Sequence, residues 1–359
     1  MPYILSVGTC NAEHKVSQTE TVSFAYEMFK DHFSNIDRLL KVFDNGQVQS
    51  RYFVKDVDWY KEPHSLKVKN DLYINKSIEY SIKAIENCLD SIGVPYHEID
   101  AIIFVSSTGF STPSIEARIM NKMPFSSNTK RIPIWGLGCA GGASGLSRAH
   151  DYCKAYPDSK VLLVCVELCS LTFQHDDYSK SNLIGTSLFA DGVAAVLVIG
   201  EDVKQNEFKY DETTYVRTVA TQSTLKPDSE EVMGWDVKDN GLNVVFSKDI
   251  PTIVDQWMNP TIHQFLIDQK LEMEQIKHLV AHPGGIKVLE AYKSALSIDD
   301  EKIEDALYIL KRYGNMSSVT VLYVLQRFLQ KDINVGDLGL LMALGPGFSS
   351  EILLLEWTN

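Results

Sequence analysis

The sequence predicts an α/β fold built from two similar halves. Apolar strand patterns alternate with amphipathic helix patterns along all 359 residues, a length that suits two fused units around a shared core. The second half repeats the first at a constant distance. IDAIIFVSS begins at Ile99 and IKHLVAHPG at Ile276, while VLLVCV begins at Val161 and LGLLMA at Leu338, so both pairs lie 177 positions apart. Strand and helix units repeated in this way indicate one ancestral unit used twice.

Each element follows from the local pattern of apolar residues. We expect a first strand in MPYILSVGTCN, because its apolar run is too short for the core of a signal peptide and has no basic segment before it. In the first half we then expect helix over 17–42, a loop entering a strand over 43–53, helix over 71–92, strands over 99–106, 132–135 and 161–168, a polar loop over 175–182, and a turn with a strand over 188–200.

The second half begins after an acidic segment, residues 201–231, which we interpret as a surface connection between the halves. A strand is expected over 242–246, a helix over 251–269, helices over 301–313 and 316–330, and two closing strands around a glycine turn.

Composition narrows the class of protein. Apolar residues make up 45% of the chain and charged residues 23%, as in ordinary soluble globular proteins. The net charge of -13 argues against a nucleic-acid partner, because nucleic-acid binding relies on a cationic surface. No apolar stretch approaches membrane-spanning length, so we expect a cytoplasmic protein. The cysteines lack the spacing of a zinc site, and Cys165 and Cys169 are expected to be buried rather than to bind metal.

A hinge at Cys139 is the first candidate for chemistry. Residues 132–135 have the pattern of a buried strand, and the glycines on both sides of Cys139 allow a sharp turn into a closely packed helix. A thiol at a helix N-terminus faces exposed N–H groups that favour the thiolate, which predicts a lowered pKa. Taken alone, a cysteine of this kind is more often buried and inert.

Two further segments change that interpretation. LVAHPGG places His282 after an apolar strand, and RYGNMSS places Asn315 at the end of a helix. An imidazole beside a thiol activates it for nucleophilic acyl transfer, and an amide donor with a His N–H stabilises a developing enolate oxygen. Position 139 shifted by the repeat distance falls next to Asn315, so Cys139 and Asn315 are expected at equivalent hinges of the two halves.

These segments resemble the type III polyketide synthases, the chalcone synthase-like condensing enzymes of the thiolase superfamily. GLGCAGG matches the nucleophile motif, AHPGG the histidine motif and GNMSS the asparagine motif, in the family's order and spacing and followed by its GPG loop. The resemblance covers essentially the whole chain. It implies a thiolase-like five-layered αβαβα sandwich of two duplicated halves, residues 1–215 with the nucleophilic cysteine and residues 216–359 with the histidine and asparagine.

The resemblance also implies the reaction. Cys139 takes a starter acyl group from coenzyme A, while His282 and Asn315 orient malonyl-CoA and stabilise the enolate left by loss of carbon dioxide, which attacks the Cys139 thioester. Repetition and cyclisation give a pyrone or a phenolic ring. We therefore expect an acyltransferase that uses malonyl-CoA and an acyl-CoA starter without metal or redox cofactor. Residues 111–120 align with the family's subunit-crossing segment and predict a homodimer.

The coenzyme A site is expected on a helix near the N-terminus. Arg38 and Lys41 lie three positions apart, which places both on one helix face, and they align with the family's phosphate-binding segment. A third basic position of the family is Asn45 here, which predicts weaker phosphate binding.

The walls of the pocket are likewise inferred from the resemblance. The matching positions are Phe189 for one gatekeeper phenylalanine and Val244 for the second, Thr172 and Ser317 for cavity hydroxyls, Thr112 for the subunit-crossing methionine of plant members, Trp235 for a plant glycine, and Gly345, Pro346 and Gly347 for the GPG loop. The missing ring at Val244 predicts a medium to long aliphatic acyl-CoA starter and an alkylpyrone or alkylresorcinol product. Trp235 predicts few extensions, and these changes argue against a phenylpropanoid starter.

Three alternatives differ in ways that can be tested. A ketoacyl synthase III takes its extender from acyl carrier protein and has different histidine and asparagine motifs. A hydroxymethylglutaryl-CoA synthase needs an acid near the cysteine, for which Glu116 is the nearest upstream candidate, but its extender is acetyl-CoA. A non-catalytic scaffold would not need a thiol, an imidazole and an amide together at the ends of elements.

Overall fold

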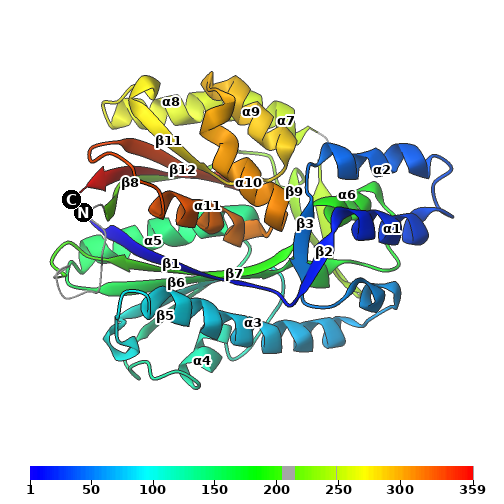
Figure 1. Cartoon of the computed structure of the whole chain (residues 1–359), viewed down its shortest axis with the longest axis horizontal. Helices are drawn as coiled ribbons and strands as arrows, with labels where there is room; N and C mark the ends of the chain where they lie inside the picture. Colours follow the sequence, from blue (N-terminus) through cyan, green and yellow to red (C-terminus); the bar gives the residue numbers. More distant parts are fainter. Residues whose placement is uncertain (204–214, 248, 359) are drawn as a thin grey trace.

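The computed structural model describes residues 1–203, 215–247 and 249–358 as a sandwich of five layers (Figure 1). Two sheets are separated by a layer of helices, and each sheet is covered on its outer face by further helices. This arrangement confirms the predicted αβαβα sandwich.

The sheet of the first half has the strand order β5-β4-β6-β7-β1. β4 runs parallel to β5 and β6, whereas β6 with β7 and β7 with β1 are antiparallel. Because helices cover both faces of the central strands, every residue of β4 and of β7 is buried. The segment 132–135, which we expected to be a buried strand, lies in and after the edge strand β5, whose residues are partly or fully exposed, and Trp135 is 50% exposed. The strands are β1 (Tyr3–Asn11), β4 (Ala101–Val105), β5 (Lys130–Ile134), β6 (Lys160–Leu168) and β7 (Asp191–Ile199).

The sheet of the second half repeats this pattern. Its order is β11-β12-β13-β8, with β11 and β12 parallel and the following two pairs antiparallel, the same sequence of directions as in β4-β6-β7-β1. The duplication predicted from the repeat distance is therefore confirmed. The two sheets join through a short antiparallel pairing of β1 with β8 at Tyr3 and Ile4. The strands are β8 (Tyr215–Leu225), β11 (Ile276–Ala281), β12 (Leu338–Gly345) and β13 (Ser349–Thr358).

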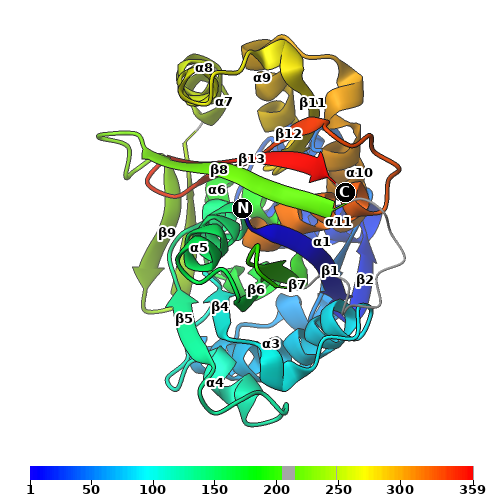
Figure 2. The same ribbon diagram turned by 90° about the vertical axis from the view of Figure 1, so that its left-hand side faces the viewer.

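The central helix layer consists of α5 (Gly141–Ala155) and α11 (Thr320–Leu329). Figure 2 shows these two helices between β8 and β13 on one side and β6 and β7 on the other. The outer layer of the first half holds α3 (Leu66–Leu89) and α4 (Ile115–Met120), and that of the second half holds α7 (Ile250–Ile253), α8 (Asn259–Asp268), α9 (Ile286–Leu296) and α10 (Glu304–Tyr313). None of the helices in the described ranges is long and apolar enough to cross a membrane.

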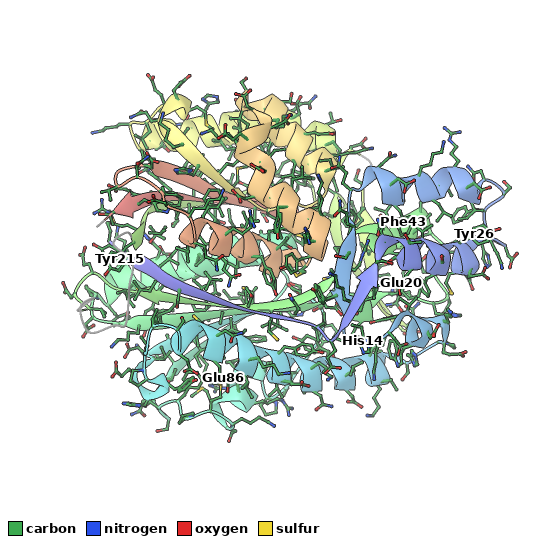
Figure 3. All side chains as sticks on the ribbon, in the orientation of Figure 1. His14, Glu20, Tyr26, Phe43, Glu86 and Tyr215 are labelled. Carbon is green, nitrogen blue, oxygen red and sulfur yellow. The ribbon has the colours of Figure 1, made fainter. Side chains whose placement is uncertain are left out.

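A smaller lobe lies at one end of the sandwich, on the right in Figure 1. Its side chains pack around Phe43, which is fully buried, whereas Tyr26 is exposed at the outer side of the lobe (Figure 3). The lobe contains α1 (Gln18–Phe29), α2 (Ile36–Asn45) and α6 (Lys180–Leu188). It also contains the antiparallel pair β2 (His14–Ser17) with β3 (Ser50–Phe53), and the hairpin β9 (Met233–Lys238) with β10 (Gly241–Phe246).

Three expectations need correction. The helix predicted over 17–42 is two helices, because the amides of His32 and Phe33 both bond to the Phe29 carbonyl and turn the chain before α2. The polar stretch 175–182 already contains the start of α6, whose first turn is capped by the Ser179 hydroxyl. The predicted surface connection 201–231 includes the sheet strand β8, and its residues 204–214 lie outside the described residues.

Candidate active site

Cys139 lies in the short 3-10 turn η3 (Gly138–Ala140), between β5 and α5. Gly138 has a φ of 45°, a left-handed conformation that favours glycine. A Cβ on Gly138 would lie 2.7 Å from Pro346 Cδ, and one on Gly345 would lie 2.6 Å from the Ala140 Cβ. The loop formed by Gly345, Pro346 and Gly347 therefore packs directly against the turn that carries the thiol, and larger residues would push the two apart.

The two hinges predicted to be equivalent lie against each other. The second hinge is the 3-10 turn η9 (Ser317–Val319), which leads into α11. A Cβ on Gly142 would lie 2.1 Å from the Ser318 carbonyl oxygen, and one on Gly141 would lie 3.1 Å from the Ser318 Cβ. The small residues after Cys139 thus bring the start of α5 into contact with the start of α11.

Asn315 connects the three predicted groups. Its Oδ1 accepts a hydrogen bond from the Cys139 thiol, with Sγ 3.9 Å away, and another from the Ser317 amide at 2.8 Å. Its Nδ2 donates to the Gly284 carbonyl at 3.0 Å, which ties the side chain to the turn after His282. An amide nitrogen has two hydrogens, so one donor of Asn315 remains for another oxygen.

His282 follows β11 and is 2% exposed. Within the described part of the chain, neither ring nitrogen has a hydrogen-bond partner. Burial lowers the pKa of the imidazole to about 3, so the ring is neutral at pH 7. A buried polar group without a partner costs about 1–3 kcal/mol, and an oxygen of a bound ligand would remove that cost. The backbone fixes the residue, because the His282 amide donates to the Met342 carbonyl at 2.8 Å.

The expected lowering of the Cys139 pKa is wrong for this structure. Burial is the main reason why the pKa of the thiol is raised to about 11. The hydrogen bond with Ser317 is the largest opposing effect, followed by the Glu167 carboxylate, which raises the pKa, and by Asn315, which lowers it. Loss of water around the sulfur therefore outweighs the favourable field of the helix N-terminus. The thiol and the imidazole are both neutral at rest.

Sequence reasoning missed Glu167, a fully buried carboxyl on β6. It accepts hydrogen bonds from the Ser107 amide at 3.0 Å and from the Ser318 hydroxyl at 2.7 Å, so it is held beside η9. Burial raises the pKa of this carboxyl to about 7. A single acid within the apolar run VLLVCVELC was the signal that could have found it, because buried carboxyls require partners.

A small, largely apolar pocket with a cavity volume of about 40 Å³ lies between the lobe and the first-half sheet. Three predicted wall residues, Thr172, Phe189 and Val244, line it together with Cys169, while Cys139, His282 and Asn315 do not. Phe189 links the pocket to the thiol, because its backbone pairs with Asn315. The remaining lining residues come from α1, β3, the turns η1 (Val57–Lys61) and η4 (Cys169–Thr172) with the residue after η4, and α6: Thr21, Phe24, Phe53, Val57, Tyr60, Ser170, Phe173, Asn182, Gly185 and Thr186.

The other predicted wall residues are distributed around this pocket. Trp235 on β9 pairs with Val244 on β10, and its ring centroid lies 5.9 Å from that of Phe189. Ser317 is buried beside the Cys139 thiol. The hydrogen bond between the Ser317 hydroxyl and this thiol lowers the pKa of the thiol. Thr112 is exposed in the loop before α4 and does not line the pocket of its own chain. Cys165 and Cys169 are buried, as expected.

The three residues expected to bind coenzyme A, Arg38, Lys41 and Asn45, are exposed on α2. Arg38 and Lys41 form no ion pair within the described ranges. The C-terminal end of α2 approaches the site through Leu188, whose Cδ2 lies 3.7 Å from the Cβ positions of both Gly46 and Gly285. The Leu188 carbonyl accepts the Asn315 amide at 2.8 Å, so α2 ends close to the catalytic candidates.

Comparison with known sequences identifies two family models that together cover almost the whole chain. Residues 2–203 match the N-terminal domain of chalcone and stilbene synthases, and residues 217–358 match the C-terminal domain. A Bacillus subtilis (strain 168) protein named "Putative chalcone synthase" is 51% identical over 99% of this chain and 99% of its own. A Mycobacterium tuberculosis (strain H37Rv) protein named alpha-pyrone synthesis polyketide synthase-like Pks18 is 27% identical over 98% of this chain and 90% of its own.

A solved structure has the same fold. The crystal structure of 1,3,6,8-tetrahydroxynaphthalene synthase from Streptomyces coelicolor A3(2), a bacterial type III polyketide synthase, superimposes with a TM-score of 0.90. The two sequences are 30% identical, and the match covers 99% of each chain. The thiolase-like form of the sandwich expected from the sequence is therefore confirmed.

Proposed function

Because the chain belongs to the chalcone and stilbene synthase family of type III polyketide synthases, which are acyltransferases, we propose that it extends an acyl-CoA starter with malonyl-CoA units at Cys139. One observation carries the assignment of this site. The Cys139 thiol donates to the Asn315 side chain, Asn315 is tied to Gly284 just after His282, and both ring nitrogens of the buried His282 lack a partner within the described residues. An imidazole with both nitrogens buried and unpaired is costly in a purely structural core, which favours a role in binding a ligand.

Loading of the starter begins from the neutral pair. The Cys139 sulfur attacks the thioester carbonyl of the starter, its proton passes to a free nitrogen of His282, and coenzyme A leaves as the thiol after taking up a proton. The raised pKa of the thiol and the lowered pKa of the imidazole keep the resting site uncharged. Charge therefore develops only when a substrate is bound, which suits a site shielded from water.

Extension requires an enolate. Malonyl-CoA loses carbon dioxide, and the electron pair of the broken C–C bond becomes the enolate of acetyl-CoA. The N–H of His282 and the second Nδ2 hydrogen of Asn315 donate to the thioester oxygen as it gains negative charge. The first hydrogen is held by Gly284, which orients the amide before the substrate arrives. The enolate carbon then attacks the carbonyl of the Cys139 thioester. The Cys139 thiolate leaves, and the extended chain, two carbons longer, remains attached to coenzyme A.

The starter is a medium to long aliphatic acyl-CoA, and the product is an alkylpyrone or an alkylresorcinol. The apolar pocket beside Phe189 and Val244 supports this assignment, because each buried methylene of a flexible tail contributes about 0.8 kcal/mol. The relative named for alpha-pyrone synthesis agrees with such a product. Trp235, opposite Val244 on the hairpin, limits the number of extensions by reducing the space next to Phe189.

Coenzyme A binds with its phosphates at α2. Arg38 and Lys41 are exposed cations without ion pairs in the described ranges, and α2 ends near Leu188 beside the catalytic candidates. Asn45 leaves one position of the family's basic segment uncharged, so binding is weaker than in members with three cations. Neither a metal nor a redox cofactor takes part in these steps.

The enzyme is a homodimer that buries β5. This strand forms one edge of the first-half sheet, and an uncovered edge invites pairing with another chain. Next to it, Trp135 is 50% exposed and Phe110 39% exposed, and their rings stack with centroids 5.5 Å apart. Exposed Thr112 lies in the same region and would reach the partner's pocket.

The test is product analysis with a series of starters. Purified enzyme is incubated with malonyl-CoA and saturated acyl-CoAs of increasing length, and products are identified by mass. Iodoacetamide should label Cys139 stoichiometrically, and prior acyl-CoA should block it, with Cys10→Ala as the matched control thiol variant. Preference for p-coumaroyl-CoA over every fatty acyl-CoA would overturn the starter assignment. Activity with malonyl-carrier protein but not malonyl-CoA would show a ketoacyl synthase III instead.

A further inference from the structure

The last turn of α6 and the two residues after it, 186–190, present carbonyl groups that the helix itself cannot satisfy. The final carbonyls of an α-helix have no amide partner within the helix, and together they form the negative end of its dipole. We call residues 186–190 the α6 turn. One side chain, that of Arg51 on β3, donates to three of these carbonyls, those of Thr186, Ser187 and Phe189.

Arg51 is fully buried and binds the α6 turn as a fork. Its Nη1 donates to the Thr186 carbonyl at 3.0 Å and to the Phe189 carbonyl at 3.1 Å, and its Nη2 donates to the Ser187 carbonyl at 2.7 Å. Among the residues that the structure describes, no carboxylate pairs with this guanidinium. Burial lowers its pKa from 12.5 to about 9, so it is still charged at pH 7. The negative end of α6 therefore takes the place of an acidic partner.

The Leu188 carbonyl, which lies between these acceptors in the chain, belongs to Asn315. It accepts the Asn315 amide at 2.8 Å, and the Asn315 carbonyl accepts the Ala190 amide at 2.9 Å. The preceding Gly314 has a φ of 71°, and a Cβ there would lie 3.0 Å from the Leu188 oxygen. The backbone of Asn315 is therefore placed by direct contact with the α6 turn, the same turn that the guanidinium holds.

The segment that carries Arg51 also holds the chain on the other side of Asn315. The Ser50 hydroxyl donates to the Arg312 carbonyl at 3.0 Å, and the Gln49 amide donates to the Lys311 carbonyl at 2.8 Å. Both acceptors lie in the last turn of α10, which ends two residues before Asn315. Residues 49–51 therefore hold both segments that meet at the catalytic candidate.

Gln18 fixes the guanidinium from the opposite side. Its Oε1 accepts a hydrogen bond from Arg51 Nη2, and its Nε2 donates to the Phe43 carbonyl of α2 at 2.9 Å. Phe43 is fully buried in the core of the lobe. The fork of Arg51 is therefore oriented by acceptors on two sides, and it ties the α6 turn to the lobe.

We propose that Arg51 is a positioning residue for decarboxylation of malonyl-CoA, because it holds the α6 turn against the backbone of Asn315 and so aims the Nδ2 donor at the enolate oxygen. This inference rests on the proposed condensing function. Arg51 is not among the residues that line the pocket, so it acts through Asn315 rather than on the substrate. Displacing a catalytic group by about 1 Å can slow a reaction about a hundredfold, so a remote anchor can determine the rate.

The experiment compares Arg51→Met with His150→Leu in the full-length enzyme. Arg51→Met keeps a long side chain and removes every donor. His150→Leu, the control, removes a different buried hydrogen bond, that between His150 Nδ1 on α5 and the Thr218 hydroxyl on β8 at 2.9 Å. Two rates are measured for each variant: release of carbon dioxide from malonyl-CoA, which uses the Asn315 donor, and acylation of Cys139 by an acyl-CoA, which needs no enolate. Their ratio does not depend on the fraction of folded enzyme.

Arg51→Met should lower kcat for carbon dioxide release by about ten- to a hundredfold, with much smaller effects on KM and on acylation of Cys139. The ratio of the two rates should fall accordingly. Arg51→Lys restores the charge and part of the donors, so its ratio should lie between those of Arg51→Met and the wild type. His150→Leu should keep the wild-type ratio.

The outcomes are distinct. A wild-type ratio in Arg51→Met would refute the positioning role and leave Arg51 as a structural cap of α6, with the proposed function standing. Absence of carbon dioxide release by the wild type would refute the proposed function itself. If Arg51→Met does not fold, Arg51→Lys decides, because an ammonium group cannot reproduce the planar fork, and a wild-type ratio in that variant would equally refute the positioning role.

Discussion

Replacing Glu167 by glutamine should make the stability of the enzyme less dependent on pH. The wild-type carboxyl is fully buried, and burial raises its pKa from 4.5 to about 7. Between these values the folded protein keeps a proton that the unfolded chain has released. The contribution of Glu167 to the free energy of unfolding is therefore fully present below pH 4.5 and is lost as the pH rises through 7. Glutamine carries no ionisable proton and removes this contribution.

The size of the effect follows from the shift. A difference of about 2.5 pH units corresponds to about 3 kcal/mol at 1.36 kcal/mol per unit. Glutamine keeps one oxygen for the Ser107 amide, and its NH2 group can donate to the Ser318 hydroxyl, so the exchange of hydrogen bonds costs about 1 kcal/mol. The variant should be slightly less stable than the wild type at pH 5 and more stable by about 2 kcal/mol at pH 8.

Urea unfolding at pH 5 and pH 8, at one fixed protein concentration, measures this difference. Glu86→Gln, on the exposed side of α3 (Figure 3), controls for removal of a carboxylate in general. Because the Glu167 charge raises the pKa of Cys139, the variant should also react faster with iodoacetamide at pH 8. If the difference between variant and wild type is the same at both pH values, Glu167 does not ionise in a buried site and the argument fails.

Three further outcomes are expected. Cys139→Ala should reduce condensation by on the order of a thousandfold or more, while release of carbon dioxide from malonyl-CoA persists. Asn315→Ala should reduce both activities, and labelled malonyl-CoA measures them. Extension of starters by the cysteine variant would disprove the assignment of Cys139 as the nucleophile. Removing Arg38 and Lys41 should raise the KM for malonyl-CoA about tenfold with a smaller effect on kcat, and an unchanged KM would place the phosphates elsewhere. Trp235→Gly should give longer polyketides by product mass, whereas Val244→Phe should lower activity with long starters more than with short ones.

Much of the architecture could be predicted from the sequence because the central strands are buried on both faces. β6, β7 and β12 are covered on both faces, so each appears as a continuous apolar run, and the constant distance of 177 positions between runs revealed the duplication before any contact was known. Cys139, His282 and Asn315 could be selected for the same reason. Each stands where an apolar or helical run ends in small residues, and the ends of equivalent elements meet in a duplicated fold.

Other elements could not be predicted from the sequence, because local patterns of similar strength favoured different structures. The helix pattern over 17–42 gave no clear sign of the break after Phe29, because the turn depends on two amides sharing one carbonyl rather than on apolar spacing. The acidic character of residues 201–231 concealed β8, whose alternating partly buried residues belong to a strand that is apolar only in part. In both places tertiary contacts decided between local patterns of similar strength.

The sequence by itself determined the family, the duplicated sandwich and the identity of the candidate catalytic groups, since these depend on residue types at fixed spacings. Only the tertiary structure decided the electrostatics and the shape of the site. Burial, which is a property of the surroundings, raises the pKa of Cys139 against the field of its own helix. The position of the Trp235 ring near Phe189 depends on the pairing of β9 with β10. Both are set by neighbours that lie far away in the chain and that folding brings together.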